Sequence, residues 1–242
     1  MKQIRLLVGT LALLAGAAAA LPAEAGDNNG DFMVRVLATG VLPDTSAGGI
    51  SVGGAPTFPS GSYKVNDELI PALTLSYFVN KNWALELFCC FAKPQIDGKG
   101  ALAAAGVRNV GDTWIFPPAV TLQYHFDPMH GFKPYAGVGF QYINFFDTNS
   151  NDLGGSMHID DAVGFTLQAG VDMVLGSGWY FNADVKKTWL STSWTISGSP
   201  VVAGAPVAGK FDLDPWIVSA GVGYRFNIED LLGRRSAPVA LK

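Results

Sequence analysis

Eight segments of this chain alternate apolar residues with polar or small ones, and this alternation limits the possible folds more than any other feature. In the last segment, Trp216, Val218 and Val222 fall on one face, whereas Ser219 and Arg225 fall on the other. Because successive side chains of a β-strand point to opposite faces, each segment is predicted to form a strand with two different faces. Within the bounds given below for each segment, the apolar face carries no charged residue.

The predicted strands are joined by connections that alternate in length along the chain. We place the strands near residues 32–41, 73–77, 83–91, 120–126, 136–142, 163–173, 179–186 and 216–226. Short turns alternate with long connections, which we place at residues 42–66, 94–112, 147–160 and 197–210. This alternation is typical of a membrane barrel with long outer loops and short periplasmic turns. We therefore predict an all-β fold, an eight-stranded antiparallel transmembrane β-barrel with four long outer loops.

The predicted domain organisation follows from the start of the chain and from its low charge. Only 15% of the residues are charged and 49% are hydrophobic, against about a quarter charged in a typical soluble domain. The apolar run Leu6–Leu21 follows Lys2 and Arg5 and precedes a small-residue cleavage motif ending at Ala25, which favours a signal peptide over a membrane anchor. We predict a signal peptide at residues 1–25, a transmembrane β-barrel at 26–226 and a C-terminal periplasmic tail at 227–242.

The polar faces of the predicted strands carry few charges, three basic and three acidic. A soluble barrel such as a lipocalin turns its polar face to water and would usually carry many more charges there. Balanced charges instead indicate a narrow lumen in which each ion finds a partner, with the apolar face turned to lipid. The predicted channel-lumen residues are Arg35, Glu86, Phe88, Gln123, Asp172, Asp184, Lys186 and Arg225.

Aromatic residues cluster at the short-turn ends of the predicted strands. Trp and Tyr are enriched at both membrane–water interfaces, so these residues are expected to form an aromatic girdle on the periplasmic side. They are Trp83, Tyr135, Trp179, Tyr224 and Phe226.

Several short stretches, in their order and spacing from Phe32 to Phe226, resemble the OmpW/AlkL family of small outer-membrane proteins. The resembling stretches include Phe116-Pro117-Pro118, Phe132–Gly139, Asn144–Asp147, Gly170-Val171-Asp172, Leu213–Trp216 and Gly223–Phe226. The resemblance implies an eight-stranded barrel with a narrow, partly apolar channel. Such a channel is expected to admit small hydrophobic molecules and to release them sideways into the membrane.

The resemblance also implies that apolar side chains close the channel low in the barrel. Phe88 matches one such position, whereas the facing position on the seventh predicted strand is Lys186, which is charged. A second departure is the end of the chain, because relatives usually stop at the final aromatic residue, here Phe226. We expect the residues Asn227–Lys242 to form a disordered periplasmic end or a contact for another envelope component.

These features favour a passive channel in the bacterial outer membrane for small hydrophobic molecules. Its expected partners are outer-membrane lipid, small hydrophobic solutes and the barrel-assembly machinery during biogenesis. Nucleic acid is not an expected partner, because the chain has no basic run and a net charge of −4. The alternative is a non-transporting surface barrel, acting as an adhesin, a receptor or a membrane-stabilising protein, because an eight-stranded lumen is narrow.

The sequence motifs favour neither an enzyme nor a cofactor or metal site. Asp147, Asn149 and Asn151 have the spacing of the first ligands in a calcium-binding loop. However, the position that requires glycine is Asp152, and the one that requires glutamate is His158. This segment is therefore predicted to be a solvated loop.

Overall fold

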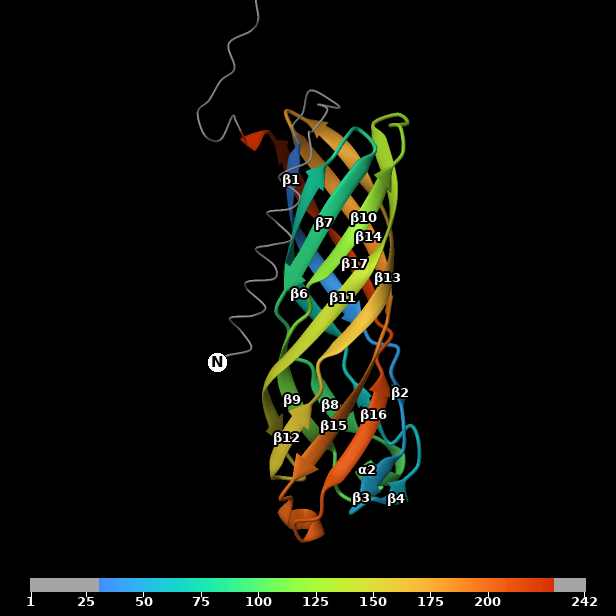
Figure 1. The fold of residues 1–242 in the computed structure, drawn as a ribbon, viewed down its shortest axis with the longest axis vertical. Helices are drawn as coiled ribbons and strands as arrows, with labels where there is room; N and C mark the ends of the chain where they lie inside the picture. The colour runs from blue at the N-terminus through green and yellow to red at the C-terminus, as the bar shows by residue number, and fades with distance from the viewer. Residues whose placement is uncertain (1–30, 229–242) are drawn as a thin grey trace, which may run out of the picture.

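The computed structural model describes residues 31–228, which form an elongated, almost wholly β-stranded molecule (Figure 1). The predicted signal peptide at 1–25, and the predicted tail beyond residue 228, lie outside the described residues. Helical structure within this range includes α2 (Gly100–Ala104) and the 3-10 turn η1 (Pro200–Val202). No helix in the described part of the chain is long and apolar enough to cross a membrane.

Eight long strands form a closed antiparallel barrel, as the alternation in the sequence predicts. Each pairs with the next of the eight along the chain, and β17 pairs with β1 to close the ring. This closing register pairs Phe32 with Phe226, so the start of the first barrel strand and the end of the last one lie at the rim that carries the short turns. The eight strands are β1 (Phe32–Leu42), β6 (Glu68–Phe78), β7 (Trp83–Cys90), β10 (Ala119–His125), β11 (Phe132–Ser150), β13 (Ala162–Gly176), β14 (Trp179–Trp189) and β17 (Trp216–Phe226).

The four long outer connections are present, and much of each forms further strands that extend the barrel away from the short-turn rim (Figure 1). The outer half of β11 pairs with β9, β9 pairs with β8, and β8 pairs with β5. A second sheet runs in the order β12, β15, β16, β3, β4, with β2 beside β16. These strands are β2 (Ser46–Ala47), β3 (Ile50–Val52), β4 (Ala55–Phe58), β5 (Tyr63–Val65), β8 (Gln95–Gly98), β9 (Asn109–Phe116), β12 (Ser156–Ile159), β15 (Ser191–Ser197) and β16 (Val207–Asp212).

Where the eight barrel strands pair with one another, their outward faces carry one charged residue, Lys187. Strand β14 continues past Lys186, where the sequence pattern ends it, and so places Lys187 on the outward face. The expectation of an uncharged apolar face is wrong here, because the alternation runs on to Trp189. The Lys187 Nζ donates to the carbonyl oxygen of Asp214 at 2.5 Å and lies 5.0 Å from the centroid of the Trp216 ring. The lysine stem thus lies along apolar surface while its ammonium group reaches the outer end of the strand.

Aromatic rings at the short-turn rim pack against one another on the outward face. The ring centroids of Trp83 and Tyr124 are 5.0 Å apart, and those of Trp179 and Tyr224 are also 5.0 Å apart. The expected place of Tyr135 in this girdle is wrong. Its side chain points inward and is buried, because it lies one residue out of phase with the outward-facing residues of β11.

The inward side chains form three layers along the barrel, which can be followed on single strands. On β1 they read Met33, then Arg35, then Leu37 from the short-turn rim outward. Met33 belongs to a small apolar cluster at the rim, and Leu37 to a large apolar cluster that fills the outer part of the molecule. Arg35 belongs to a buried polar layer between them. On this strand the buried charged residue therefore lies between two apolar layers.

Candidate functional site

All eight residues predicted to line the lumen have buried side chains inside the barrel. Six of them fall in the polar layer, Phe88 lies at its outer boundary, and Arg225 lies nearer the short-turn rim. The alternation of the strands is sufficient to turn these side chains inward. The register between strands then decides which of them meet.

Arg35 lies at the centre of the polar layer and joins three strands. Its Nε and Nη2 donate to the two carboxylate oxygens of Asp172, at 3.1 and 2.7 Å. Its Nη1 donates to Glu86 at 3.0 Å and to the Ser76 hydroxyl at 2.7 Å. Two parallel hydrogen bonds to one carboxylate are among the strongest polar contacts in proteins, so Arg35 fixes Asp172 firmly across the lumen.

Lys186 forms the second ionic centre of the polar layer. Its Nζ lies 2.5 Å from Asp184 and 3.3 Å from Glu86, so Glu86 connects the two ionic centres. The same Nζ lies 4.9 Å from the centroid of the Phe88 ring. The two residues therefore face each other, as expected from the family resemblance. The charged residue at this position therefore closes against the aromatic face through a cation–π contact rather than through apolar packing.

Gln168 binds the carboxylates of this layer, although the prediction based on charge did not select it. Its Nε2 donates to Glu86 at 2.9 Å and to Asp184 at 2.7 Å. Its Oε1 accepts from the Thr121 hydroxyl at 2.7 Å and from Gln123 Nε2 at 3.1 Å. The alternation places Gln168 on the inward face, and this signal could have identified it.

Tyr135 and Asn182 complete the hydrogen bonding of the acidic residues. The Tyr135 hydroxyl donates to Asp184 at 2.8 Å, and Asn182 Nδ2 donates to Asp172 at 2.9 Å and to the Tyr135 oxygen at 3.0 Å. A Cβ at Gly170 would lie 2.4 Å from the Tyr135 ring and hydroxyl, so only glycine admits this tyrosine to the lumen. The polar layer therefore forms a continuous plug across the barrel.

Closer to the short-turn rim, two further cations pack on one aromatic ring. The guanidinium carbon of Arg225 lies 3.9 Å and the Nζ of Lys133 lies 5.7 Å from the centroid of Phe78. The Lys133 Nζ also donates to the carbonyl oxygen of Lys81 at 3.1 Å. The predicted balance of three basic and three acidic side chains is therefore incorrect. Lys133 adds a buried cation, because β11 begins before the segment assigned from the sequence.

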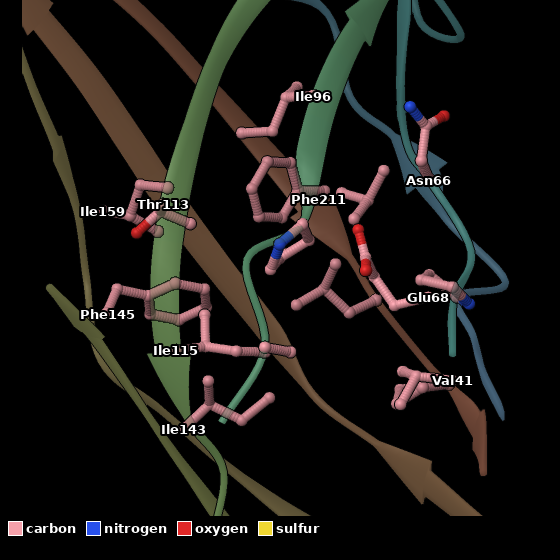
Figure 2. A pocket seen from close by; sticks show the side chains of 16 residues that line it. Val41, Asn66, Glu68, Ile96, Thr113, Ile115, Ile143, Phe145, Ile159 and Phe211 are labelled. Atoms are coloured by element: carbon pink, nitrogen blue, oxygen red, sulfur yellow. The ribbon is translucent and has the colours of Figure 1, made fainter. Parts of the chain in front are cut away.

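On the outer side of Phe88 the lumen changes from polar to apolar and contains a cavity of about 50 Å³ (Figure 2). Its surface is apolar, and strands from all sides of the outer barrel contribute to it. Most of the side chains that line it are apolar, among them Val41, Ala92, Ile96, Ile115, Phe145 and Phe211, and three are polar: Asn66, Glu68 and Thr113. An apolar cavity of this kind excludes water and favours apolar groups.

Three aromatic side chains form the core of the outer extension beside this cavity. The Trp194 and Phe211 rings lie edge-on to Tyr63, with centroid distances of 5.5 and 5.8 Å. Burial raises the pKa of the Tyr63 hydroxyl, which donates to the carbonyl oxygen of Lys210 at 2.5 Å. Because Phe211 also lines the cavity, this aromatic cluster covers its outer side.

The barrel wall is interrupted next to the cavity, at the seam between β7 and β10. The last pair of their ladder is Phe88 with Ala119, and the next contact outward is a single bridge between Ala92 and Ile115. Pro117 and Pro118 precede β10 and supply no backbone N–H for a ladder. We call this stretch, residues 89–91 facing 116–118, the wall gap.

On the outward side the wall gap is covered by two stacked rings. The centroids of Phe91 and Phe116 are 5.0 Å apart with an interplanar angle of 27°. On the inward side, Ala92 and Ile115 line the apolar cavity. The cavity is thus separated from the outside of the barrel by side chains and one backbone bridge, not by a complete hydrogen-bonded ladder.

The segment with calcium-loop spacing is built into the outer sheets. Asn149 lies on β11, and its Nδ2 donates to Asp112 at 3.3 Å; Asn151 Nδ2 donates to the same carboxylate at 3.3 Å. Within residues 31–228, no group of three or more His, Cys, Asp or Glu side chains is arranged to hold a metal ion.

Comparisons with known proteins agree on one family. The OmpW family pattern matches residues 28–226. The uncharacterised outer-membrane protein y4mB of Sinorhizobium fredii is 36% identical over 195 residues, covering 81% of this chain and 80% of its own. The outer membrane protein AlkL of Ectopseudomonas oleovorans is 30% identical over 204 residues, covering 84% and 85%. The dibenzothiophene metabolism operon protein PahQ of Pseudomonas aeruginosa is 26% identical over 168 residues, covering 69% and 76%.

Solved structures give the same result for the fold. The crystal structure of the outer membrane protein OprG from Pseudomonas aeruginosa is similar to this chain, with a TM-score of 0.73 and 30% sequence identity. The match covers 84% of this chain and 98% of OprG. The closed eight-stranded barrel and its outer extension therefore have a counterpart among outer-membrane proteins of known structure.

Proposed function

Since this chain belongs to the OmpW family of outer-membrane β-barrel proteins, we propose that it is a passive channel for the uptake of small hydrophobic molecules. The protein is located in the outer membrane. The observation that carries the proposal is the apolar cavity above a sealed polar plug. A solute that prefers this cavity to water is one with little polar surface.

The plug argues against passage of such a solute along the barrel axis. Arg35, Glu86 and Lys186 are buried and paired across the lumen. Separating a buried ion pair leaves an uncompensated charge, which costs about 3–5 kcal/mol. An apolar molecule offers nothing to replace the lost contacts. The route to the periplasm through the middle of the barrel is therefore unfavourable for this class of solute.

The wall gap supplies a way out. Ala92 and Ile115 line the cavity, and the bridge between them consists of hydrogen bonds of 3.3 and 2.9 Å. Each such bond contributes about 0.5–1.5 kcal/mol net, so parting the bridge costs less than parting the plug. Movement of the Phe91 and Phe116 rings then connects the cavity with the hydrocarbon region of the membrane. We therefore propose sideways release at this point.

The name of one relative supports an apolar solute. PahQ is named for a dibenzothiophene metabolism operon, and dibenzothiophene is an apolar aromatic compound. Dibenzothiophene is therefore a reasonable first solute to test with this chain, although the choice among apolar compounds depends on the cavity walls.

Filling the cavity tests the proposal. We expect Ala92→Leu to lower the uptake of labelled dibenzothiophene by cells that carry the protein, because Ala92 is 4% exposed and lines the cavity. Ala84→Leu is the matched control, because Ala84 is a buried inward alanine on β7, the strand that leads to Ala92, but belongs to the apolar cluster at the short-turn rim. Overpacking can cost about 1–3 kcal/mol in either variant, so the amount of folded barrel is measured by its gel mobility before boiling.

Two results would contradict the channel. Equal uptake by cells that carry equal amounts of folded Ala92→Leu and Ala84→Leu protein would show that the solute does not pass through the cavity. Equal uptake with and without the wild-type protein would favour the non-transporting surface barrel. In that case, shortening the outer connections should abolish the binding of a ligand or host surface.

A further inference from the structure

A second hollow lies on the outside of the barrel, on the face turned to lipid. It has a volume of about 680 Å³ and crosses β7, β10, β11, β13, β14 and β17. We call it the lipid-side groove. Its lining includes Trp83, Ala136, Ala169, Lys187 and Trp216.

Two small side chains make the floor of the lipid-side groove. Ala136 and Ala169 are register partners on β11 and β13, and both side chains are exposed on the outward face. The neighbouring row, Val138 with Leu167, carries larger side chains and forms a wall. Large residues beside a pair of alanines leave a depression about one side chain deep.

The groove runs obliquely from one membrane interface to the other. Trp83 begins β7 directly after a short turn, whereas Trp216 begins β17 after an outer connection. The rows of paired residues run perpendicular to strands that are tilted by about 35–45° in such barrels. Across five inter-strand steps the path is roughly 24 Å long. Its shape therefore suits a long flexible hydrocarbon chain.

The outer end of the groove carries a single cation, Lys187. Its side chain is 12% exposed, and Asp44, which is 75% exposed, lies 3.7 Å from Nζ. The Asp214 carbonyl oxygen is at 2.5 Å. An ammonium group has three N–H donors, and among residues 31–228 the Asp214 carbonyl is its hydrogen-bond acceptor. Asp44 is an exposed ion-pair partner of Lys187, so an anionic group that binds Nζ takes the place of the Asp44 carboxylate and leaves the Asp214 hydrogen bond intact.

We propose that the lipid-side groove is a specific binding site for an acyl lipid of the outer leaflet that carries an anionic phosphate headgroup. The headgroup binds Lys187 beside the Trp216 indole, and one acyl chain lies over Ala136 and Ala169. The charge at the outer end selects an anionic headgroup over a zwitterionic one. The inference is independent of the proposed channel, because the groove faces lipid and the cavity faces the lumen.

Quenching of tryptophan fluorescence by brominated lipids measures this binding. The full chain is placed in phosphatidylcholine vesicles that contain a brominated phosphatidylglycerol or a brominated phosphatidylcholine at equal mole fraction. The part of the quenching that comes from the lipid-side groove is the difference between the wild type and Trp216→Phe. We expect an apparent preference of about five-fold for the anionic lipid, the effect of one lysine near a membrane surface.

Two variants distinguish the contribution of the lipid headgroup from that of the acyl chain. Lys187→Met should abolish the preference while leaving quenching by the zwitterionic lipid in place. Ala136→Leu with Ala169→Leu should fill the floor and reduce quenching by both lipids. The matched control is Ala38→Leu with Ala220→Leu, which are also register partners with exposed outward side chains but lie outside the groove.

The proposal is overturned if Lys187→Met keeps the preference, or if the two alanine pairs give the same quenching. It is also overturned if the protein is dimeric in vesicles and only the Ala136/Ala169 change makes it monomeric. A second copy of the chain would then occupy the groove in place of lipid.

Discussion

Arg35 holds the polar plug together at the scale of single residues. Its guanidinium group binds Ser76 on β6, Glu86 on β7 and Asp172 on β13, so it ties together strands on different sides of the ring. A planar guanidinium group with five donors suits this role, because it can serve several acceptors in fixed directions. Arg35 is therefore a structural residue, and in the proposed channel it also forms part of the barrier to axial passage.

Removal of Arg35 alone should be strongly destabilising. Arg35→Met leaves Asp172 and Glu86 with fewer partners in a buried site, and we expect a loss of about 3–5 kcal/mol in unfolding free energy. Arg35→Met with Asp172→Leu removes both members of the bidentate pair and should recover part of the loss. Urea unfolding, followed by gel mobility without boiling, measures both. A single variant as stable as the wild type would show that the pair is not stabilising.

Residue alternation in the sequence was enough to predict which side chains point inward, but not which of them meet. Arg35 and Asp172 are 137 positions apart, and their contact depends on the combined register around the ring. Errors occurred where a strand runs beyond its apparent pattern, as for Lys133 and Lys187. Tyr135 was assigned by residue type to the girdle, although its position on β11 places it inside.

The outer sheets are the elements that the sequence predicts least well. Strand β9 carries glycine and polar residues, and it is stabilised by the distant outer half of β11. Such pairing is decided by tertiary contacts that a local pattern does not contain. The barrel strands were predictable because lipid on one side and a filled lumen on the other impose a strict alternation. Most of the outer strands are shorter than the barrel strands.

A charged contact between β9 and Lys93, which precedes β8, should make the outer strands sensitive to acid. Lys93 Nζ lies 2.9 Å from Asp112 on β9, and this hydrogen bond holds the pKa of Asp112 below its ordinary value of 3.8. Its stabilising contribution is present above the ordinary value and is lost as the pH falls through the lower folded-state value. We expect the amides of β9 to lose hydrogen-exchange protection in that range, after correction for intrinsic rates.

Asp112→Asn and Lys93→Met are the matched variants for this measurement. Each removes the ion pair, and each should abolish the acid-dependent step in β9 while leaving the amides of the transmembrane strands protected. A wild-type pH profile in Asp112→Asn would contradict the role assigned to this contact.

The whole molecule combines a closed transmembrane barrel, a polar plug and an apolar outer interior. Its ladder is continuous around most of the ring and interrupted beside the cavity, where β7 ends at Cys90 and β10 begins at Ala119. A molecule that enters the outer cavity therefore meets a costly barrier below it and a thin wall beside it. This difference between the axial and sideways routes is the central claim about function.

Locking the wall gap tests this claim most directly. Ala92→Cys with Ile115→Cys places two thiols at the single bridge, and Cys89→Ala with Cys90→Ala removes the native thiols from this background. A hydrogen-bonded pair of this kind has a Cα separation of about 5.5 Å, which is within disulfide range. Leu85→Cys with Leu122→Cys is the control on the same seam, because those residues are partners in the complete ladder.

The measurement is the uptake of labelled dibenzothiophene by cells that carry each pair of cysteines, first oxidised and then reduced. The account predicts that oxidation stops uptake through the Ala92/Ile115 pair, that reduction restores it, and that the Leu85/Leu122 pair gives the same uptake in both states. Equal uptake by the oxidised and reduced Ala92/Ile115 protein would contradict sideways release through this gap.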